Sequence, residues 1–306
     1  GDKLKVALLL AGPISDQGWN AMAYEGLKKI EKDFGFEIAY SESIPQSDRE
    51  EQYRGYANQG FDIIFGHGFE FIDSATKVSA EFPDVKFILT SCTVFQEPNL
   101  GSVTDDGLAK GFLGGVAAGV LTESNQVSFL GGLEIPPIVA GRDGFEAGAK
   151  YVNPDVKVVS TLIGNFEDAG KAKELAFSLS EQGSDILMVQ ADAAGLGGIE
   201  GAQEKGIRVI GTNSDQNSVA PDTVVTSALA DYSVAMSLVV QQIIDGSWEP
   251  SSSVMGVKEG VTALAPYHGF EDKITAEQKE RIESVRQEII NGSLNVEEKV
   301  KELVSQ

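Results

Sequence analysis

The sequence predicts an α/β protein with two lobes, each built around a doubly wound, mostly parallel sheet. Three observations support this prediction. The chain has 306 residues, which is long for one hydrophobic core and comfortable for two. Short apolar segments alternate with amphipathic ones, an order typical of parallel strands joined by right-handed helical crossovers. The alternation ends near residue 121 and starts again at residue 126.

The first half of the chain follows this alternation from its beginning. The expected strands are Lys5–Leu10, Glu37–Tyr40, Phe61–Phe65 and Val85–Thr90. The expected helices are Trp19–Phe34, Arg49–Gln59, Ile72–Phe82 and Gly111–Leu121. The last of these is rich in small residues, so we expect it to pack closely on a sheet.

The second half repeats the topology without repeating the sequence. The expected strands are Gln126–Leu130, Val156–Leu162, Ile186–Val189 and Arg208–Gly211. The expected helices are Val139–Val152, Ala172–Gln182, Gly197–Lys205, Asp231–Asp245 and Thr275–Asn291. The last residues, Glu297–Gln306, are expected to form either a short charged helix or a frayed tail. Thr275 and Gln278 have the spacing of a capping box, and Gly292 stands where a helix-ending glycine belongs.

Segments near Thr223–Ala228 and Ser253–Gly256 are expected to pass between the lobes. The resulting division places residues 1–123 and 230–252 in the first lobe. It places residues 124–229 and 253–306 in the second lobe, so that the chain crosses over three times.

Composition excludes several classes of function. The net charge of −22 leaves no basic patch for nucleic acid. Cys92 is the only cysteine, and His67 and His268 lack the spacing of a zinc site. The segment Gly164–Ala172 resembles a phosphate-binding loop but has one residue too many and no Ser or Thr for magnesium. We therefore expect no catalytic residues, no cofactor and no metal.

Candidate binding residues of the first half follow the first and third strands, because ligands of open α/β sheets bind at the carboxyl ends of strands. Asp16, Trp19 and Asn20 combine a carboxylate, a large ring and an amide. His67 and Phe69 stand beside flexible glycines. Alternatively, Asp16 is a helix cap, Trp19 anchors the core and His67 is a structural histidine.

Candidate residues of the second half are Glu134, Asp192, Asn213 and Asp215, each in a loop that follows an expected strand. Asp231 stands at a crossing between lobes, and Asp215 also fits the role of a turn residue. Rings from one lobe with carboxylates and amides from the other suit a flat solute that carries hydroxyl or N–H groups. The sequence therefore predicts two lobes that close on a small molecule.

The chain resembles, over nearly its whole length, the basic-membrane-protein family of substrate-binding lipoproteins, which includes bacterial purine-nucleoside receptors. The segment Asp16–Asn20 is similar to the family's Asp-x-x-(Phe/Trp)-Asn motif, and Asn213–Gln216 resembles its Asp-Ser-Asp-Gln motif. The resemblance rests on Asp16–Asn20, Tyr24–Gly26, Gly66–Phe69, Glu81–Phe87, Gly111–Ala118, Gly131–Pro136, Gly144–Gly148, Tyr151–Pro154, Asn213–Gln216 and Ala220–Asp222.

This resemblance implies two Rossmann-like lobes of the type I periplasmic-binding-protein-like fold. It also implies a monomer outside the cytoplasm, periplasmic or anchored as a lipoprotein, that delivers a purine base or nucleoside to an ABC permease. Asp16 and Asn20 would hydrogen-bond the purine, and Trp19 or Phe69 would stack on it. We expect the precursor to carry a signal peptide and a lipidated cysteine.

The chain departs from the family pattern at three places. Asn213 replaces the first aspartate of one loop, Thr226–Asp231 lacks the family's frequent lysine, and Asp192 replaces a neutral residue of the family. The lost aspartate and lysine put the recognition of ribose in doubt. These losses favour a free base or a modified nucleoside over an ordinary nucleoside. The alternative functions are the same fold binding another small solute, such as a sugar or polyol, and an enzyme or cytoplasmic regulator on a related fold.

Overall fold

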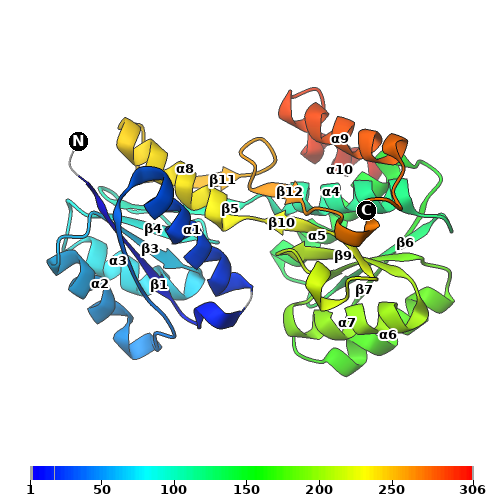
Figure 1. Cartoon of the computed structure of the whole chain (residues 1–306), viewed down its shortest axis with the longest axis horizontal. Coiled ribbons are helices and arrows are strands. Elements are labelled where there is room, and N and C mark those ends of the chain that lie inside the picture. The colour runs from blue at the N-terminus through cyan, green and yellow to red at the C-terminus, as the bar shows by residue number, and fades with distance from the viewer. Residues whose placement is uncertain (1–2, 17, 305–306) are drawn as a thin grey trace. The chain divides into compact units, whose positions relative to one another are not determined.

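The computed structural model describes residues 3–16 and 18–304 of the chain. It divides into two compact units, each with its own sheet (Figure 1). Gln17 of the first candidate loop lies outside the described residues, and so do residues 1–2 and 305–306 of the predicted lobes. Unit 1 comprises Gly1–Asp105, Asp231–Met255 and Glu259–Val261, and unit 2 comprises Asp106–Ala230, Gly256–Lys258 and Thr262–Gln306.

Unit 1 contains a parallel sheet in the strand order β11-β5-β4-β3-β1-β2. Its strands are β1 (Lys5–Leu10), β2 (Glu37–Ser41), β3 (Ile63–His67), β4 (Lys86–Thr90), β5 (Leu100–Asp105) and β11 (Ser252–Met255). Its helices are α1 (Trp19–Phe34), α2 (Arg49–Asn58), α3 (Ile72–Ser79) and α8 (Tyr232–Asp245). Strand β1 is apolar almost throughout because helices cover both faces of this sheet.

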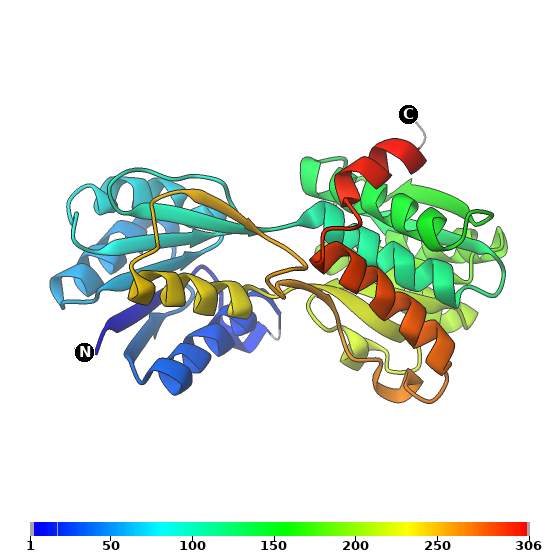
Figure 2. The same ribbon diagram turned by 90° about the horizontal axis from the view of Figure 1, so that it is seen from above.

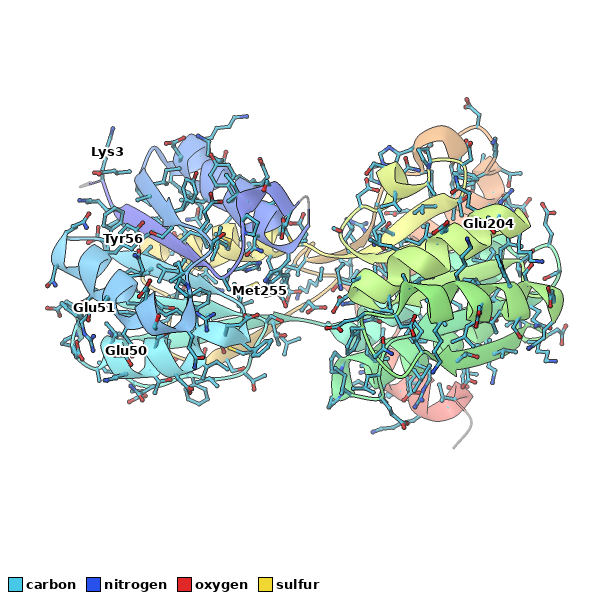
Figure 3. The ribbon with its side chains drawn as sticks, turned by 90° about the horizontal axis from the view of Figure 1, so that it is seen from below. Lys3, Glu50, Glu51, Tyr56, Glu204 and Met255 are labelled. Carbon is cyan, nitrogen blue, oxygen red and sulfur yellow. The ribbon has the colours of Figure 1, made fainter. Side chains whose placement is uncertain are left out.

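The helices of unit 1 lie in two pairs. α2 and α3 cover the face of the sheet that carries Ala7 and Leu9. α1 and α8 run side by side on the other face (Figure 2), where a Cβ on Gly26 would lie 3.0 Å from the Cα of Ser233. On the outer surface of α2, Arg54 pairs with Glu50 and Glu51, which Figure 3 labels.

Unit 2 contains a sheet in the order β12-β10-β9-β8-β6-β7, parallel except for β12. Its strands are β6 (Gln126–Gly131), β7 (Lys157–Leu162), β8 (Ile186–Gln190), β9 (Arg208–Asn213), β10 (Val224–Ala230) and β12 (Thr262–Leu264). Its helices are α4 (Gly107–Leu121), α5 (Pro136–Val152), α6 (Ala169–Glu181), α7 (Asp192–Lys205), α9 (Ala276–Ile290) and α10 (Val296–Leu303).

The boundary of the units differs from the expected division at residues 106–123, which belong to unit 2 rather than to the first lobe. The cause is the packing of α4 against α5. A Cβ on Gly115 would lie 2.1 Å from the carbonyl oxygen of Phe145, and one on Gly144 would lie 2.2 Å from that of Leu108. No residue larger than glycine fits between backbones this close, and the resulting contacts hold α4 to unit 2.

Four strands were not among those expected from the sequence. β10 and β11 occupy the segments expected only to pass between the lobes, and neither β5 nor β12 was expected at all. β5 contains Gly101 and Ser102, which are typical of a loop. Gly101 is required there because a Cβ would lie 2.8 Å from the indole of Trp248. By contrast, the capping box of Thr275 and Gln278 at the start of α9 is confirmed.

Candidate functional site

Strand register brings the first two candidate loops together in unit 1. β1 and β3 are neighbours, with Leu10 opposite His67, so both strands end at the same edge of the sheet. The indole of Trp19 stacks on the imidazole of His67, with ring centroids 3.8 Å apart and planes 20° apart. The ring of Tyr232 meets the indole edge-on at 5.3 Å. These three rings form an aromatic cluster at the carboxyl end of the sheet.

Asp16 is fully engaged in holding the start of α1. Its carboxylate accepts hydrogen bonds from the backbone N–H groups of Gly18, Asn20 and Ala21 and from the Asn20 side-chain amide, at 2.8 to 3.0 Å. Burial raises the pKa of Asp16, but these hydrogen bonds together outweigh it and lower the pKa below its usual value. Asp16 therefore acts as a helix-capping anion, the alternative interpretation of its sequence position.

Asn20 presents an acceptor beside this cap. Its side chain is only 8% exposed. Because a carboxylate can only accept, the Asn20 nitrogen must face Asp16, which fixes the orientation of the amide. The Asn20 Oδ1 atom is buried and has no hydrogen-bond partner among residues 3–16 and 18–304. A buried acceptor without a donor is unfavourable, so this oxygen is suited to an N–H group of a ligand.

His67 is buried completely and both of its ring nitrogens are engaged. Nε2 lies 2.9 Å from the carbonyl oxygen of Trp19, which can only accept, so Nε2 carries the proton. Nδ1 therefore accepts from the hydroxyl of Thr90 at 2.7 Å, and that hydroxyl in turn accepts from the backbone N–H of Gly68. Burial lowers the pKa of His67 to about 4. The imidazole is thus neutral, and its role is to support Trp19.

Two further candidates, Phe69 and Asp231, lie in unit 1. Phe69 is the second residue after β3 and is 67% exposed, so its ring is available for stacking. Asp231 caps α8 by accepting from the backbone N–H and the hydroxyl of Ser233. Tyr232 is buried, and its hydroxyl donates to Asp105 Oδ1 at 2.8 Å. Burial, and then the charge of Asp105, raise the pKa of Tyr232.

The candidates of unit 2 do not all come together. Glu134 pairs at the surface with Arg142 of α5 at 3.5 Å. Asp215 bonds the backbone N–H of Asn217 and pairs with His268 Nε2 at 2.6 Å, which agrees with its alternative role in a turn. Asp192 and Asn213, by contrast, share an edge, because β8 and β9 are parallel neighbours.

Lys110 joins that edge and was missed by the sequence reasoning. It lies in the first turns of α4, is 5% exposed, and donates from Nζ to Asn213 Oδ1 at 2.7 Å. Its positive charge lowers the pKa of Asp192, against the larger raising effect of desolvation. A signal existed in the sequence, since Lys110 is the single charged residue of an otherwise apolar segment, Gly107–Leu121.

Two kinds of feature are absent from the described ranges 3–16 and 18–304. No group of three or more His, Cys, Asp or Glu side chains in these ranges is arranged to hold a metal ion. Within the same residues, no helix combines the length and apolar character needed to cross a bilayer.

Comparisons with known proteins agree with the predicted family and fold. The chain matches the family model Bmp, described as "ABC transporter substrate-binding protein PnrA-like", over residues 3–300. Basic membrane protein A of Borreliella afzelii is 31% identical over 299 residues, covering 95% of this chain and 91% of that protein. A purine-binding protein of Brucella abortus is 28% identical over 298 residues, covering 96% and 83%.

Two solved structures share the whole fold. A transcriptional activator of the comK gene from Bacillus halodurans has a TM-score of 0.83 at 26% identity, covering 95% of this chain and 99% of that one. A solute-binding protein of an ABC transporter system from Conexibacter woesei has a TM-score of 0.81 at 25% identity, covering 95% and 98%. The predicted α/β fold with two periplasmic-binding-protein-like lobes is confirmed.

Proposed function

We propose that this chain, which belongs to the Bmp family of PnrA-like ABC transporter substrate-binding proteins, binds a purine base or nucleoside outside the cytoplasm and delivers it to an ABC permease. We further propose that it acts as a monomer, either periplasmic or anchored as a lipoprotein. The observation that supports the purine most directly is the aromatic cluster at the carboxyl end of the unit 1 sheet.

The cluster has the properties that a flat heterocycle requires. His67 covers one face of the half-buried Trp19 indole and holds it in place. Phe69 adds an exposed ring after the neighbouring strand. The buried Asn20 Oδ1 offers an acceptor for an N–H of the base. Stacking supplies affinity and the acceptor supplies orientation. The relative from Brucella abortus is named for purine binding, which agrees with this chemistry.

The same residues argue for binding without catalysis. A general base needs a free site for a proton near neutral pH. Both nitrogens of His67 are engaged and its pKa of about 4 keeps it neutral. The Asp16 carboxylate is saturated by four hydrogen bonds. We therefore propose that these groups hold a solute and do not transform it.

A thermal-shift screen tests the proposal. Adenine, hypoxanthine, guanine and their nucleosides are compared with glucose, galactose and ribose. A true ligand at about 100 times its dissociation constant stabilises the fold by about 2.7 kcal/mol. Stabilisation by purines alone is expected. Stabilisation by sugars alone would refute the purine proposal and establish the sugar-binding alternative.

A further inference from the structure

Glu70 carries an unpartnered oxygen at the carboxyl end of the unit 1 sheet. It lies in the short turn Phe69–Phe71, which follows β3 after a single glycine. Its side chain is half-buried, and its Oε2 atom is buried without a hydrogen-bond partner among residues 3–16 and 18–304. Removing a carboxylate oxygen from water without supplying a donor is unfavourable. This acceptor therefore calls for an explanation.

Gly68 directs the carboxylate of Glu70 toward Trp19. Its φ of 115° is a conformation that residues with a side chain rarely adopt. A Cβ at this position would lie 2.2 Å from Glu70 Oε2 and 3.6 Å from Trp19 Nε1. The carboxylate and the nitrogen edge of the indole thus flank the same small space, which only glycine leaves open. Glu70 therefore lies beside the aromatic cluster.

Arg49 fixes the turn without neutralising this carboxylate oxygen. Its Nη1 atom donates to the backbone carbonyl oxygen of Glu70 at 3.1 Å. Its guanidinium lies 5.2 Å from the ring centroid of Phe71, which is fully buried. The guanidinium thus holds the main chain of the turn, while Glu70 Oε2 stays without a donor in the described part of the chain. The position of Glu70 is set by its backbone, and its carboxylate is left for a solute.

The polar groups around Trp19 add a second acceptor. Asn20 Oδ1 is buried and, within the described ranges, also lacks a donor. The Asp16 carboxylate and both nitrogens of His67 are already engaged. A heterocycle stacked on Trp19 would therefore meet unpartnered oxygens, which accept N–H groups and repel carbonyl oxygens. An amino substituent suits this arrangement, and an oxo substituent does not.

We propose that Glu70 is a specificity-determining residue, whose carboxylate accepts an N–H of the exocyclic amino group of a purine stacked on Trp19. The site then selects aminopurines over purines that carry an oxo group in the same place. A carboxylate can only accept, so a carbonyl oxygen opposite it finds no donor and faces a negative charge. The inference deepens the proposed function and rests on it, because it names the class of purine.

Calorimetric titration of the intact chain tests this role. Adenine, 2-aminopurine, hypoxanthine and unsubstituted purine are compared, each as the free base or the ribonucleoside, whichever form the thermal-shift screen selects. Wild type should bind the better aminopurine at least tenfold more tightly than hypoxanthine or unsubstituted purine. Glu70→Met should weaken that aminopurine by about tenfold to a hundredfold, the usual effect of losing a hydrogen bond to a charged group. Binding of unsubstituted purine should change less than about twofold.

Two further variants make the result specific. Glu70→Gln keeps the size of the side chain and offers an amide N–H to an oxo group, so it should bind hypoxanthine about fivefold or more tighter than wild type does. Glu51→Gln removes an exposed carboxylate of α2, labelled in Figure 3, that pairs with Arg54 at 2.7 Å. It should change none of the affinities. Melting curves establish that each variant is folded at the temperature of titration.

Three outcomes overturn the inference. Equal weakening of all four purines by Glu70→Met would make the carboxylate a structural group only. Hypoxanthine that binds wild type as tightly as the aminopurines would remove the selectivity. Aminopurine affinity that Glu70→Met leaves unchanged would show that the carboxylate does not contact the solute. Failure of every purine to bind wild type would instead refute the proposed function, so the two failures are distinguishable.

Discussion

Replacing Trp19 by alanine tests the aromatic cluster most directly. The indole is half-buried, with one face on His67 at 3.8 Å and its edge against Tyr232 at 5.3 Å. Stacking of a base on an aromatic ring is worth roughly 1–3 kcal/mol in nucleic-acid binders. Trp19→Ala should therefore weaken purine binding by about tenfold to a hundredfold.

The same substitution affects stability, because both ring contacts disappear. Aromatic pairs contribute about 0.5–1.5 kcal/mol each, so the free energy of unfolding should fall by about 1–3 kcal/mol. Titration must therefore be done at a temperature where circular dichroism shows the variant to be folded. Affinity and stability then report separately on the ligand contact and on the packing.

Trp248 provides a matched control. It is the other tryptophan of the chain, it is also half-buried, and it packs on Gly101 of β5 with the Lys86 ammonium 6.0 Å from its ring. Trp248→Ala should lower stability and leave purine affinity unchanged. If Trp19→Ala leaves the affinity of the folded protein intact, the stacking role is refuted, and Phe69 becomes the remaining candidate.

Four other substitutions test the surrounding structure. The pKa of His67 is about 4 in the folded state and about 6.5 when unfolded, so the unfolded chain binds more protons between these values. Stability is full above pH 6.5 and falls as the pH drops toward 4. In urea unfolding, the free energy of unfolding should fall by about 2 kcal/mol between pH 7 and pH 4.5, because His67 takes up a proton on unfolding. The His67→Gln variant should not show this decrease. Gly115→Ala places a Cβ 2.1 Å from a carbonyl oxygen and should destabilise by more than about 3 kcal/mol or prevent folding. Gly55→Ala, with nothing within 4 Å, should instead stabilise by about 0.5–1 kcal/mol, and thermal melts that rank the two alike would contradict the packing argument. Asp16→Ala removes the cap of α1, and should reduce the free energy of unfolding by about 0.5–2 kcal/mol in urea titrations while also lowering purine affinity.

Most strands and helices could be predicted from the sequence, because alternating apolar and amphipathic segments specify a doubly wound sheet. The exceptions have local causes. β5 contains Gly101, which makes room for the indole of Trp248. β12 has only three residues, too few for a periodic pattern. The start of α4 was placed at residue 111 instead of 107, so Lys110 fell outside the expected helix.

The candidate binding residues could be placed after the right strands, but their interactions could not be predicted. The stacking of Trp19 on His67 depends on the register that sets Leu10 opposite His67. That register follows from packing across the whole sheet rather than from either loop. Likewise, no local pattern predicts that Asn213 contacts a lysine that lies 103 positions earlier in the chain.

The close approach of α4 and α5 has a mechanical consequence for unit 2. Their contact is made by backbone against backbone, as at Gly115 and Gly144, so neither helix can slide or rotate without a collision. Lys110 is carried by one of these helices, and its ammonium donates to Asn213 Oδ1 at the end of β9. The glycines of α4 and α5 therefore make the two helices a single rigid pair within unit 2, and side chains that project from either helix keep the positions that this pair gives them.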